Sequence, residues 1–241
     1  MTGHRMSLSH ESLFFPSLPL ILYNIVIHGR DADHFNSSFL QDQISKRRSF
    51  MKGYIEVYTG DGKGKTTAAI GLAVRAVGAG KKVCFIQFMK SLAYSEQKIL
   101  QGLPGLTLIT LGKPYFIAKE GMLSEEEIKA WGSALRVYPA GHPPKEYRDM
   151  VLKGIEDAVK AVSKDYDLVV LDEYNMAYWY ELATEEDTKR ILAARSPDCE
   201  LVFTGRNAPK IILDAADLIT EMKKIRHYYD KGVECRKGIE N

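Results

Sequence analysis

The stretch Thr59-Gly-Asp-Gly-Lys-Gly-Lys-Thr-Thr67 decides how this chain folds. It follows a short alternating apolar run, residues 54–58, and precedes a run with helical spacing, residues 68–77. A glycine-rich turn between a strand and a helix N-terminus directs several backbone N–H groups to one point, where the helix dipole adds partial positive charge. The stretch therefore predicts a loop that binds polyphosphate.

The loop is a variant of the pattern G-x-x-x-x-G-K-[ST]. Gly64-Lys65-Thr66 fits the second half of the pattern, and Thr59 stands where the first glycine belongs. Gly60 and Gly62 supply the backbone freedom instead. A plain turn with solvated lysines is the alternative, but the flanking strand and helix favour phosphate binding.

The side chains of the loop have separate predicted roles. We expect Lys65 to neutralise phosphate oxygens, Thr66 to place its hydroxyl on Mg²⁺, and Thr67 to offer a second hydroxyl. Lys63 either contacts phosphate or faces water. Asp61 would repel a phosphate unless it faces a ribose hydroxyl or a metal ion.

Composition limits the classes of partner. The 241 residues include 33 basic and 31 acidic side chains, a net charge of +2, which gives no electrostatic case for nucleic acid. Cys84, Cys199 and Cys235 are odd in number and widely spaced. They form no metal-binding pattern and suit a reducing compartment, so we expect a cytoplasmic protein.

The first fifty residues differ from the rest of the chain. The apolar run Leu13–Ile27 contains Pro16 and Pro19. It is shorter than the roughly 20 residues that a membrane span needs, and no signal-peptide cleavage pattern follows it. We expect residues 1–50 to be a poorly ordered extension or a misassigned start, with Met51 just before the first strand, and residues 51–241 to form the P-loop domain.

Strand-like and helix-like segments alternate after residue 51. This order predicts an α/β fold of the P-loop NTPase (RecA-like) kind, a single domain with a mainly parallel sheet and helices on both faces. The expected strands are residues 54–58, 82–88, 106–111, 167–173, 200–204 and 218–225, the last near an edge. The expected helices are residues 68–77, 124–135, 145–162, 184–194 and 209–216.

Polar residues follow several of these strands. Ligands of open parallel sheets bind at the carboxyl ends of the strands, where the loop, residues 87–90, Asp172-Glu173 and residues 204–206 all fall. Asp172 or Glu173 would hold Mg²⁺ against the phosphates, and Arg206 would fork onto phosphate oxygens. The alternative for the two acids is that they only mark the solvent end of their strand. The alternative for Arg206 is a surface charge with no ligand. We expect the aromatic residues between 174 and 180 to form core or dimer contacts rather than to bind the ligand.

Five segments together resemble the ATP:corrinoid adenosyltransferases of the P-loop type. The segments are Tyr58–Ala69, Leu168–Glu173, Phe203–Arg206, Ile212–Met222 and Lys231–Glu240, in order and at matching spacing. The aspartate-rich helix followed by Thr-Glu-Met and the Gly-Ile-Glu ending are the specific parts, since a P-loop alone is generic. The resemblance runs from about Met51 to Glu240 and is weakest between residues 91 and 148.

The resemblance implies that a cobalt(I) corrinoid attacks the 5′ carbon of ATP and displaces triphosphate. Cob(I)alamin or another corrinoid and ATP would be substrates, with Mg²⁺ as cofactor. Residues 60–67, that is Gly60, Asp61, Gly62, Lys63, Gly64, Lys65, Thr66 and Thr67, would bind the triphosphate, with Lys65 and Thr66 catalytic. Thr66 and Glu173 would bind the metal and Arg206 further parts of the ligand. A homodimer and an electron-donating reductase or flavodoxin are the implied partners.

Two departures from the family pattern concern the site. The family often has asparagine where Asp61 stands. The segment that carries an aromatic for the lower face of cobalt reads Ser91-Leu-Ala-Tyr-Ser95 here, so Tyr94, Tyr115 or Phe116 is the candidate, with core packing as the alternative.

Two other functions remain open from the sequence. An ATP-hydrolysing motor or kinase-like phosphotransferase would need a residue that activates water or an acceptor hydroxyl, and none is evident. A non-catalytic nucleotide-binding regulator or corrinoid carrier would bind both ligands without forming a cobalt–carbon bond. The products made from ATP and reduced cobalamin distinguish all three.

Overall fold

Six parallel strands form the central sheet in residues 52–91 and 94–240, the part of the chain that this computed structural model describes. Their order across the sheet is β3-β2-β6-β7-β1-β8. The bounds are Ile55–Thr59 (β1), Val83–Phe88 (β2), Leu106–Leu111 (β3), Leu168–Asp172 (β6), Glu200–Thr204 (β7) and Leu218–Glu221 (β8). The predicted parallel α/β fold is confirmed, and β8 lies at an edge as expected.

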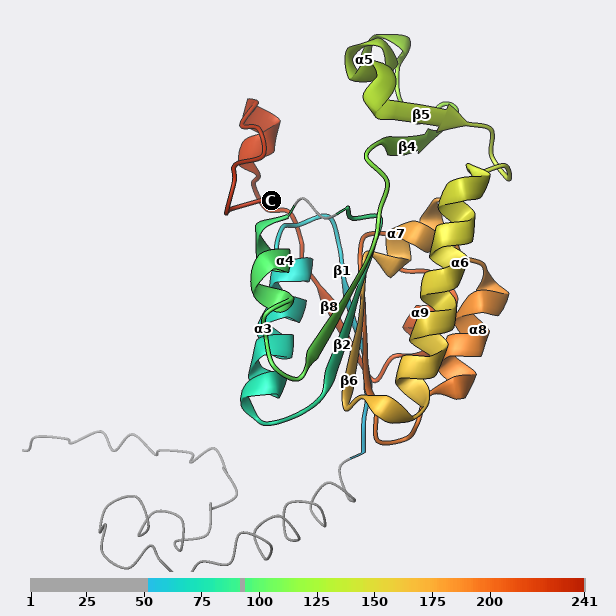
Figure 1. The fold of residues 1–241 in the computed structure, drawn as a ribbon. Coiled ribbons are helices and arrows are strands. Elements are labelled where there is room, and N and C mark those ends of the chain that lie inside the picture. Colours follow the sequence, from blue (N-terminus) through green and yellow to red (C-terminus); the bar gives the residue numbers. More distant parts are fainter. Residues whose placement is uncertain (1–51, 92–93, 241) are drawn as a thin grey trace, which may run out of the picture. The chain divides into compact units, whose positions relative to one another are not determined.

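Helices cover both faces of the sheet (Figure 1). Helices α3 (Lys65–Gly78) and α4 (Ser95–Leu100) lie on one face. The other face carries α6 (Lys145–Lys160), α7 (Tyr174–Trp179), α8 (Glu185–Ala194) and α9 (Lys210–Ala215). Right-handed crossovers between parallel strands place helices in this way. The central strands β2, β6 and β7 are therefore buried from both sides, whereas the four residues of the edge strand β8 are exposed.

The burial of β2 shows why its sequence is apolar at every position except Gln87. All six residues of β2 are buried. Cys84, Ile86 and Phe88 join the larger core cluster, whereas Val83 and Phe85 join the cluster under α3. Successive strand residues point to opposite faces, so a strand between two layers of helices needs apolar side chains at both.

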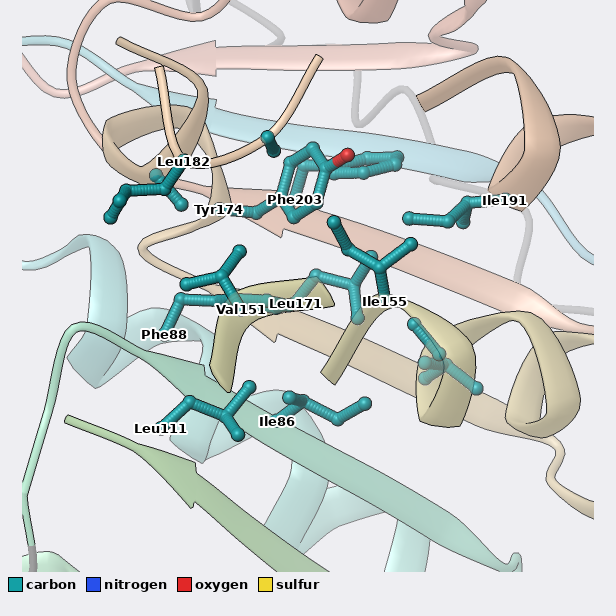
Figure 2. Close-up of a cluster of buried hydrophobic side chains, with 14 of the residues drawn as sticks. Ile86, Phe88, Leu111, Val151, Ile155, Leu171, Tyr174, Leu182, Ile191 and Phe203 are labelled. Atoms are coloured by element: carbon teal, nitrogen blue, oxygen red, sulfur yellow. The ribbon is translucent and has the colours of Figure 1, made fainter. Parts of the chain in front are cut away.

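The larger core cluster lies between the sheet and helices α6 to α9 (Figure 2). Val151 and Ile155 of α6 are fully buried in it. The Tyr174 ring packs edge-on against Phe88 and Phe203, with centroid distances of 5.2 and 5.4 Å. The core role expected for the aromatic residues after the two acids is therefore confirmed for Tyr174.

One region differs from the sequence prediction. Residues 116–138 form a second, two-stranded parallel sheet of β4 (Phe116–Lys119) and β5 (Leu135–Tyr138), connected by α5 (Glu125–Trp131) and a 3₁₀ turn (Gly132–Ala134). The predicted capping box at Ser124 is present, but the helix ends at Trp131 rather than continuing to Leu135. Gly132 has φ of 52°, which ends the helix and lets the chain pair with β4.

Two other boundaries differ from expectation. Helix α6 ends at Lys160 and continues as a π-helical turn (Ala161–Asp165), and β8 ends at Glu221 instead of continuing to residue 225.

No helix in residues 52–91 and 94–240 is long and apolar enough to cross a membrane. Residues 1–50, with the apolar run Leu13–Ile27, lie outside the described residues, so the expectation of an extension stays a prediction.

Candidate active site

The phosphate loop connects β1 to α3 at the carboxyl edge of the sheet. Gly64 is the N-cap residue of α3, with φ of 122°, a conformation that favours glycine. Among the described residues no side chain caps this helix, and its first turn holds no acid. The first N–H groups of the helix therefore remain available for an anion, as the sequence predicted.

Two glycines of the loop are needed for a close backbone approach. A Cβ atom on Gly60 would lie 2.6 Å from the Met222 carbonyl oxygen, and one on Gly62 would lie 2.5 Å from it. The Gly62 N–H donates to the same oxygen at 2.6 Å. The backbone after β8 thus supports the loop, and Gly60 acts through this contact because it does not line the pocket.

Lys65 lies folded under the loop. Its Nζ donates to the carbonyl oxygens of Gly60 at 2.8 Å and Gly62 at 2.7 Å, and the residue is 8% exposed. Burial lowers the pKa of Lys65, while the nearby Glu173 carboxylate opposes that shift. A polyphosphate in the loop would give this ammonium much stronger acceptors than two carbonyls.

Asp172 ends β6 and is fully buried. Its Oδ1 accepts hydrogen bonds from the Thr66 hydroxyl at 2.9 Å and the Thr204 hydroxyl at 2.7 Å. Its Oδ2 accepts from Lys90 Nζ at 2.9 Å and Gln87 Nε2 at 3.2 Å. Four donors from α3, β7, β2 and the residues after β2 therefore hold one carboxylate, which offsets the cost of burying its charge.

Lys90 is a site residue that the sequence analysis did not single out. Its Nζ contacts both Asp172 and the Thr66 hydroxyl, the latter at 3.2 Å. Burial alone would lower the pKa of Lys90, but the carboxylates of Asp172, Glu173 and Glu96 together raise it. The available signal was its position among the polar residues at the carboxyl end of β2, which were predicted to lie on this edge.

Glu173 lies directly after the buried strand in a left-handed conformation, with φ of 60°. Its backbone N–H donates to the Thr204 hydroxyl at 3.0 Å, and its side chain lines the pocket. Burial, followed by the neighbouring Asp172 charge, raises the pKa of Glu173. The strained backbone thus directs a carboxyl group at the space in front of the loop.

The oxygen atoms here fit a magnesium ion. The Thr66 hydroxyl and the carboxylates of Asp172 and Glu173 are hard ligands, which Mg²⁺ prefers. The described residues hold no group of three or more His, Cys, Asp or Glu side chains that could bind a metal alone. Mg²⁺ in nucleotide sites usually takes only one or two carboxylates and completes its shell with phosphates and water.

A pocket of about 670 Å³ lies in front of these groups. Of the predicted site residues, Asp61 to Thr67, Glu173 and Arg206 line this pocket, while Gly60 and Asp172 do not. The Asp61 Oδ1 accepts from the Lys224 N–H at 3.1 Å, and this bond lowers the pKa of Asp61. The acid that seemed out of place in a phosphate loop therefore also fixes the chain after β8.

The C-terminal residues form another wall of the pocket. Lys63 Nζ donates to the Ile239 carbonyl oxygen at 3.0 Å and lies 3.7 Å from the Glu240 carboxylate. Arg236 and Tyr228 bind the same carboxylate, and Arg236 Nη2 lies 3.0 Å from Glu240 Oε1. The sequence analysis noted the Gly-Ile-Glu ending as a motif but did not place it at the loop.

The three aromatic candidates lie in different places. Tyr94 lines the pocket, with its ring centroid 5.3 Å from Lys90 Nζ. Tyr115 packs edge-on against Tyr147, with a centroid distance of 5.9 Å, and Phe116 packs against Trp131. Only the first of the three is in the pocket of the phosphate loop among the residues that the structure describes.

Comparison with known proteins gives one consistent family. The sequence model described as "ATP:corrinoid adenosyltransferase BtuR/CobO/CobP" matches residues 51–241. Corrinoid adenosyltransferase CobA of Salmonella typhimurium is 32% identical over 189 residues, 78% of this chain and 86% of the relative. Corrinoid adenosyltransferases of Escherichia coli and a Sinorhizobium species are each 30% identical, over 78% and 83% of this chain and 86% of each relative.

Proposed function

The chain belongs to the ATP:corrinoid adenosyltransferase family, and we propose that it transfers the 5′-deoxyadenosyl group of ATP to the cobalt(I) of cob(I)alamin or a related corrinoid. The observation that carries the proposal is the pocket in which Lys65, Thr66 and Glu173 come together at the N-terminus of α3. That arrangement fits the triphosphate of ATP, the group that leaves in this reaction.

The reaction forms one bond and breaks one. The cobalt electron pair of the reduced corrinoid forms the bond to C5′, and the C5′–O bond breaks with its electron pair leaving on triphosphate. The nucleophile carries no proton, so no general base is required. The protein therefore has to position two substrates and stabilise charge on the leaving group.

The residues of the loop perform that second task. The free N–H groups of α3 are fixed before the reaction at the place where the triphosphate would bind, and negative charge increases there as the C5′–O bond breaks. The Lys65 ammonium would move from the Gly60 and Gly62 carbonyls to the phosphate oxygens. Arg206 adds a planar donor group from the end of β7. Thr66, Glu173 and Asp172 would hold Mg²⁺, which when bound neutralises phosphate oxygens.

The remaining features of the proposal concern substrates and setting. We propose Mg²⁺ as the cofactor, a homodimer as the assembly, and a reductase or flavodoxin as the source of electrons for cobalt. The buried free thiols of Cys84 and Cys199 support a cytoplasmic setting, where thiols stay reduced. Burial raises the pKa of both thiols, so neither is a reactive thiolate.

An anaerobic incubation with ATP, Mg²⁺ and chemically reduced cobalamin tests the proposed reaction. We expect adenosylcobalamin and triphosphate in equal amounts, followed by absorbance and by chromatography of the phosphates. ADP and phosphate would instead identify an ATP-hydrolysing enzyme. Binding of both substrates without either set of products would identify a carrier or regulator. Parallel reactions with cobinamide and cobyrinic acid diamide determine the preferred corrinoid.

A further inference from the structure

Lys90 lies where a divalent cation would have to lie. Its Nζ is 2.9 Å from Asp172 Oδ2 and 3.2 Å from the Thr66 Oγ1, two of the groups that we assign to the metal. The carboxylate of Glu96 is a further neighbour, at 3.9 Å. The same oxygen atoms that would bind Mg²⁺ thus bind an ammonium group of the protein.

Packing and strand register fix this position. The pairing of β2 with β6 aligns Gln87 with Asp172, so the residues that follow β2 leave the sheet beside the acid. Met89 has φ of 57°, an uncommon conformation for a side-chain-bearing residue, and it turns the chain just before Lys90. The Lys90 side chain is only 13% exposed. Its ammonium is therefore part of the interior of the site.

The two lysines of the phosphate loop make different contacts from Lys90. Lys65 Nζ donates to the loop carbonyls of Gly60 and Gly62, and Lys63 Nζ to the carbonyl of Ile239. Within residues 52–91 and 94–240, Asp172 forms an ion pair with one cation, Lys90. This makes Lys90 the charge that balances the buried acid.

We propose that Lys90 is a tethered cation that fills the metal position of the site and excludes a divalent ion until the polyphosphate of the nucleotide binds. The proposal rests on the proposed function, because it takes the site to bind metal together with ATP. Two cations repel each other strongly at close range beside groups as buried as Asp172 and Lys90, so an ammonium and a divalent ion do not share Asp172 and Thr66. A polyphosphate supplies anionic oxygens to which Lys90 can transfer.

Metal binding without nucleotide tests this role directly. Mn²⁺ serves as the probe, and its binding to the protein is measured by electron paramagnetic resonance in the absence of any phosphate. We expect Lys90→Met to bind Mn²⁺ at least about tenfold more tightly than the unaltered protein, within the usual range of coupling between two ligands. Lys90→Arg keeps the charge and should bind Mn²⁺ as weakly as the unaltered protein.

Lys98→Met is the matched control. Lys98 lies on α4 and is exposed, so this variant removes the same charge from the same region without touching Asp172. It should leave the affinity for Mn²⁺ unchanged. Circular dichroism confirms that each variant is folded, and Lys90→Gln replaces Lys90→Met with the same expectation if the latter does not fold.

The proposal is overturned if folded Lys90→Met and Lys90→Gln bind Mn²⁺ alone no more tightly than the unaltered protein does. The proposed function is checked separately, by Mn²⁺ binding to the unaltered protein with inorganic tripolyphosphate. Tripolyphosphate-dependent binding there, with no gain in the Lys90 variants, refutes the role of Lys90 alone. No binding with tripolyphosphate refutes the metal–triphosphate site itself.

Discussion

Two pairs of carboxylates lie at opposite edges of the same sheet, and their surroundings differ. At the carboxyl edge, Asp172 and Glu173 are close to Lys90, Lys65 and Arg206, and all but Asp172 line the pocket of the phosphate loop. At the amino edge, Glu56 of β1 and Glu200 of β7 contact each other on neighbouring strands. An ion pair with Lys90 holds the first pair. In the part of the chain that the structure describes, cations such as Arg195 and Arg75 lie near the second pair but form no ion pair with it.

Neutral donors form the hydrogen bonds to the amino-edge pair. The Tyr54 N–H donates to Glu200 Oε2 at 2.9 Å, and the Tyr58 hydroxyl donates to Glu56. Burial, and then the contact with Glu56, raises the pKa of Glu200 to about 7, with Arg195 opposing only in part. Protonation of Glu200 would relieve the repulsion here, whereas a lysine relieves it at the other edge.

The comparison shows that two acids do not make a metal site by themselves. Both pairs lie at ends of strands, but at the carboxyl edge a helix N-terminus, the Thr66 hydroxyl and an ion-paired lysine also gather around the acids. In a parallel sheet the helix N-termini and the loops after the strands gather at that edge, so charged ligands bind there.

Breaking the charge balance at the carboxyl edge should have the largest effect. Asp172→Asn leaves Lys90 without its carboxylate inside the protein, and we expect the free energy of unfolding to fall by about 3 kcal/mol. Urea unfolding followed by circular dichroism measures the change. The double variant with Lys90→Met removes both charges and should recover at least half of the loss. A single-variant cost below about 1 kcal/mol would contradict the balance described here.

Removing the lysine that we assign to the leaving group should affect the rate rather than the fold. Lys65→Ala removes charge stabilisation of triphosphate, and we expect at least about a hundredfold lower kcat, equivalent to about 2.7 kcal/mol. Anaerobic turnover with reduced cobalamin measures it. Lys98→Met, an equal loss of charge away from the loop, is the control. Near-normal turnover of Lys65→Ala would refute its assigned role.

The amino-edge pair should give the smallest effect, with a distinctive dependence on pH. The pKa of Glu200 is about 7 in the folded protein and 4.5 ordinarily, so the folded state binds the extra proton and stability falls as pH rises between these values. Glu200→Gln should therefore stabilise the protein by about 1 kcal/mol at pH 8, after allowing for solvent screening, and by nothing at pH 4. Thermal unfolding at both pH values measures this, and an equal effect at both would falsify it.

Local patterns explain why much of the fold could be predicted. The six strands, the Ser124 capping box and helix α8 depend on periodicity and on residues three positions apart, and they were placed nearly correctly. The small sheet of β4 and β5 was missed, because its four-residue strands are too short for a period to show. The predicted end of α5 was wrong because residues 135–138 pair with β4, and this strand pairing competes with helix formation.

The candidate site also has a part that the sequence could predict and a part that it could not. The loop residues 60–67, the two acids after β6 and Arg206 were predicted because each follows a recognisable strand, and all but Gly60 and Asp172 line one pocket. The sequence could not show that Met222 supports the loop or that Ile239 and Glu240 bind Lys63, since those contacts join distant segments.

The sequence by itself determined that a phosphate loop lies between a strand and a helix of a parallel sheet, because a glycine-rich turn and the flanking periods are properties of neighbouring residues. Only the tertiary structure decided that Lys90 balances Asp172, 82 positions away. That contact depends on β2 lying beside β6 with a particular register. Strand order and register follow from how the two core clusters pack against the helices, and no short segment of the chain encodes them.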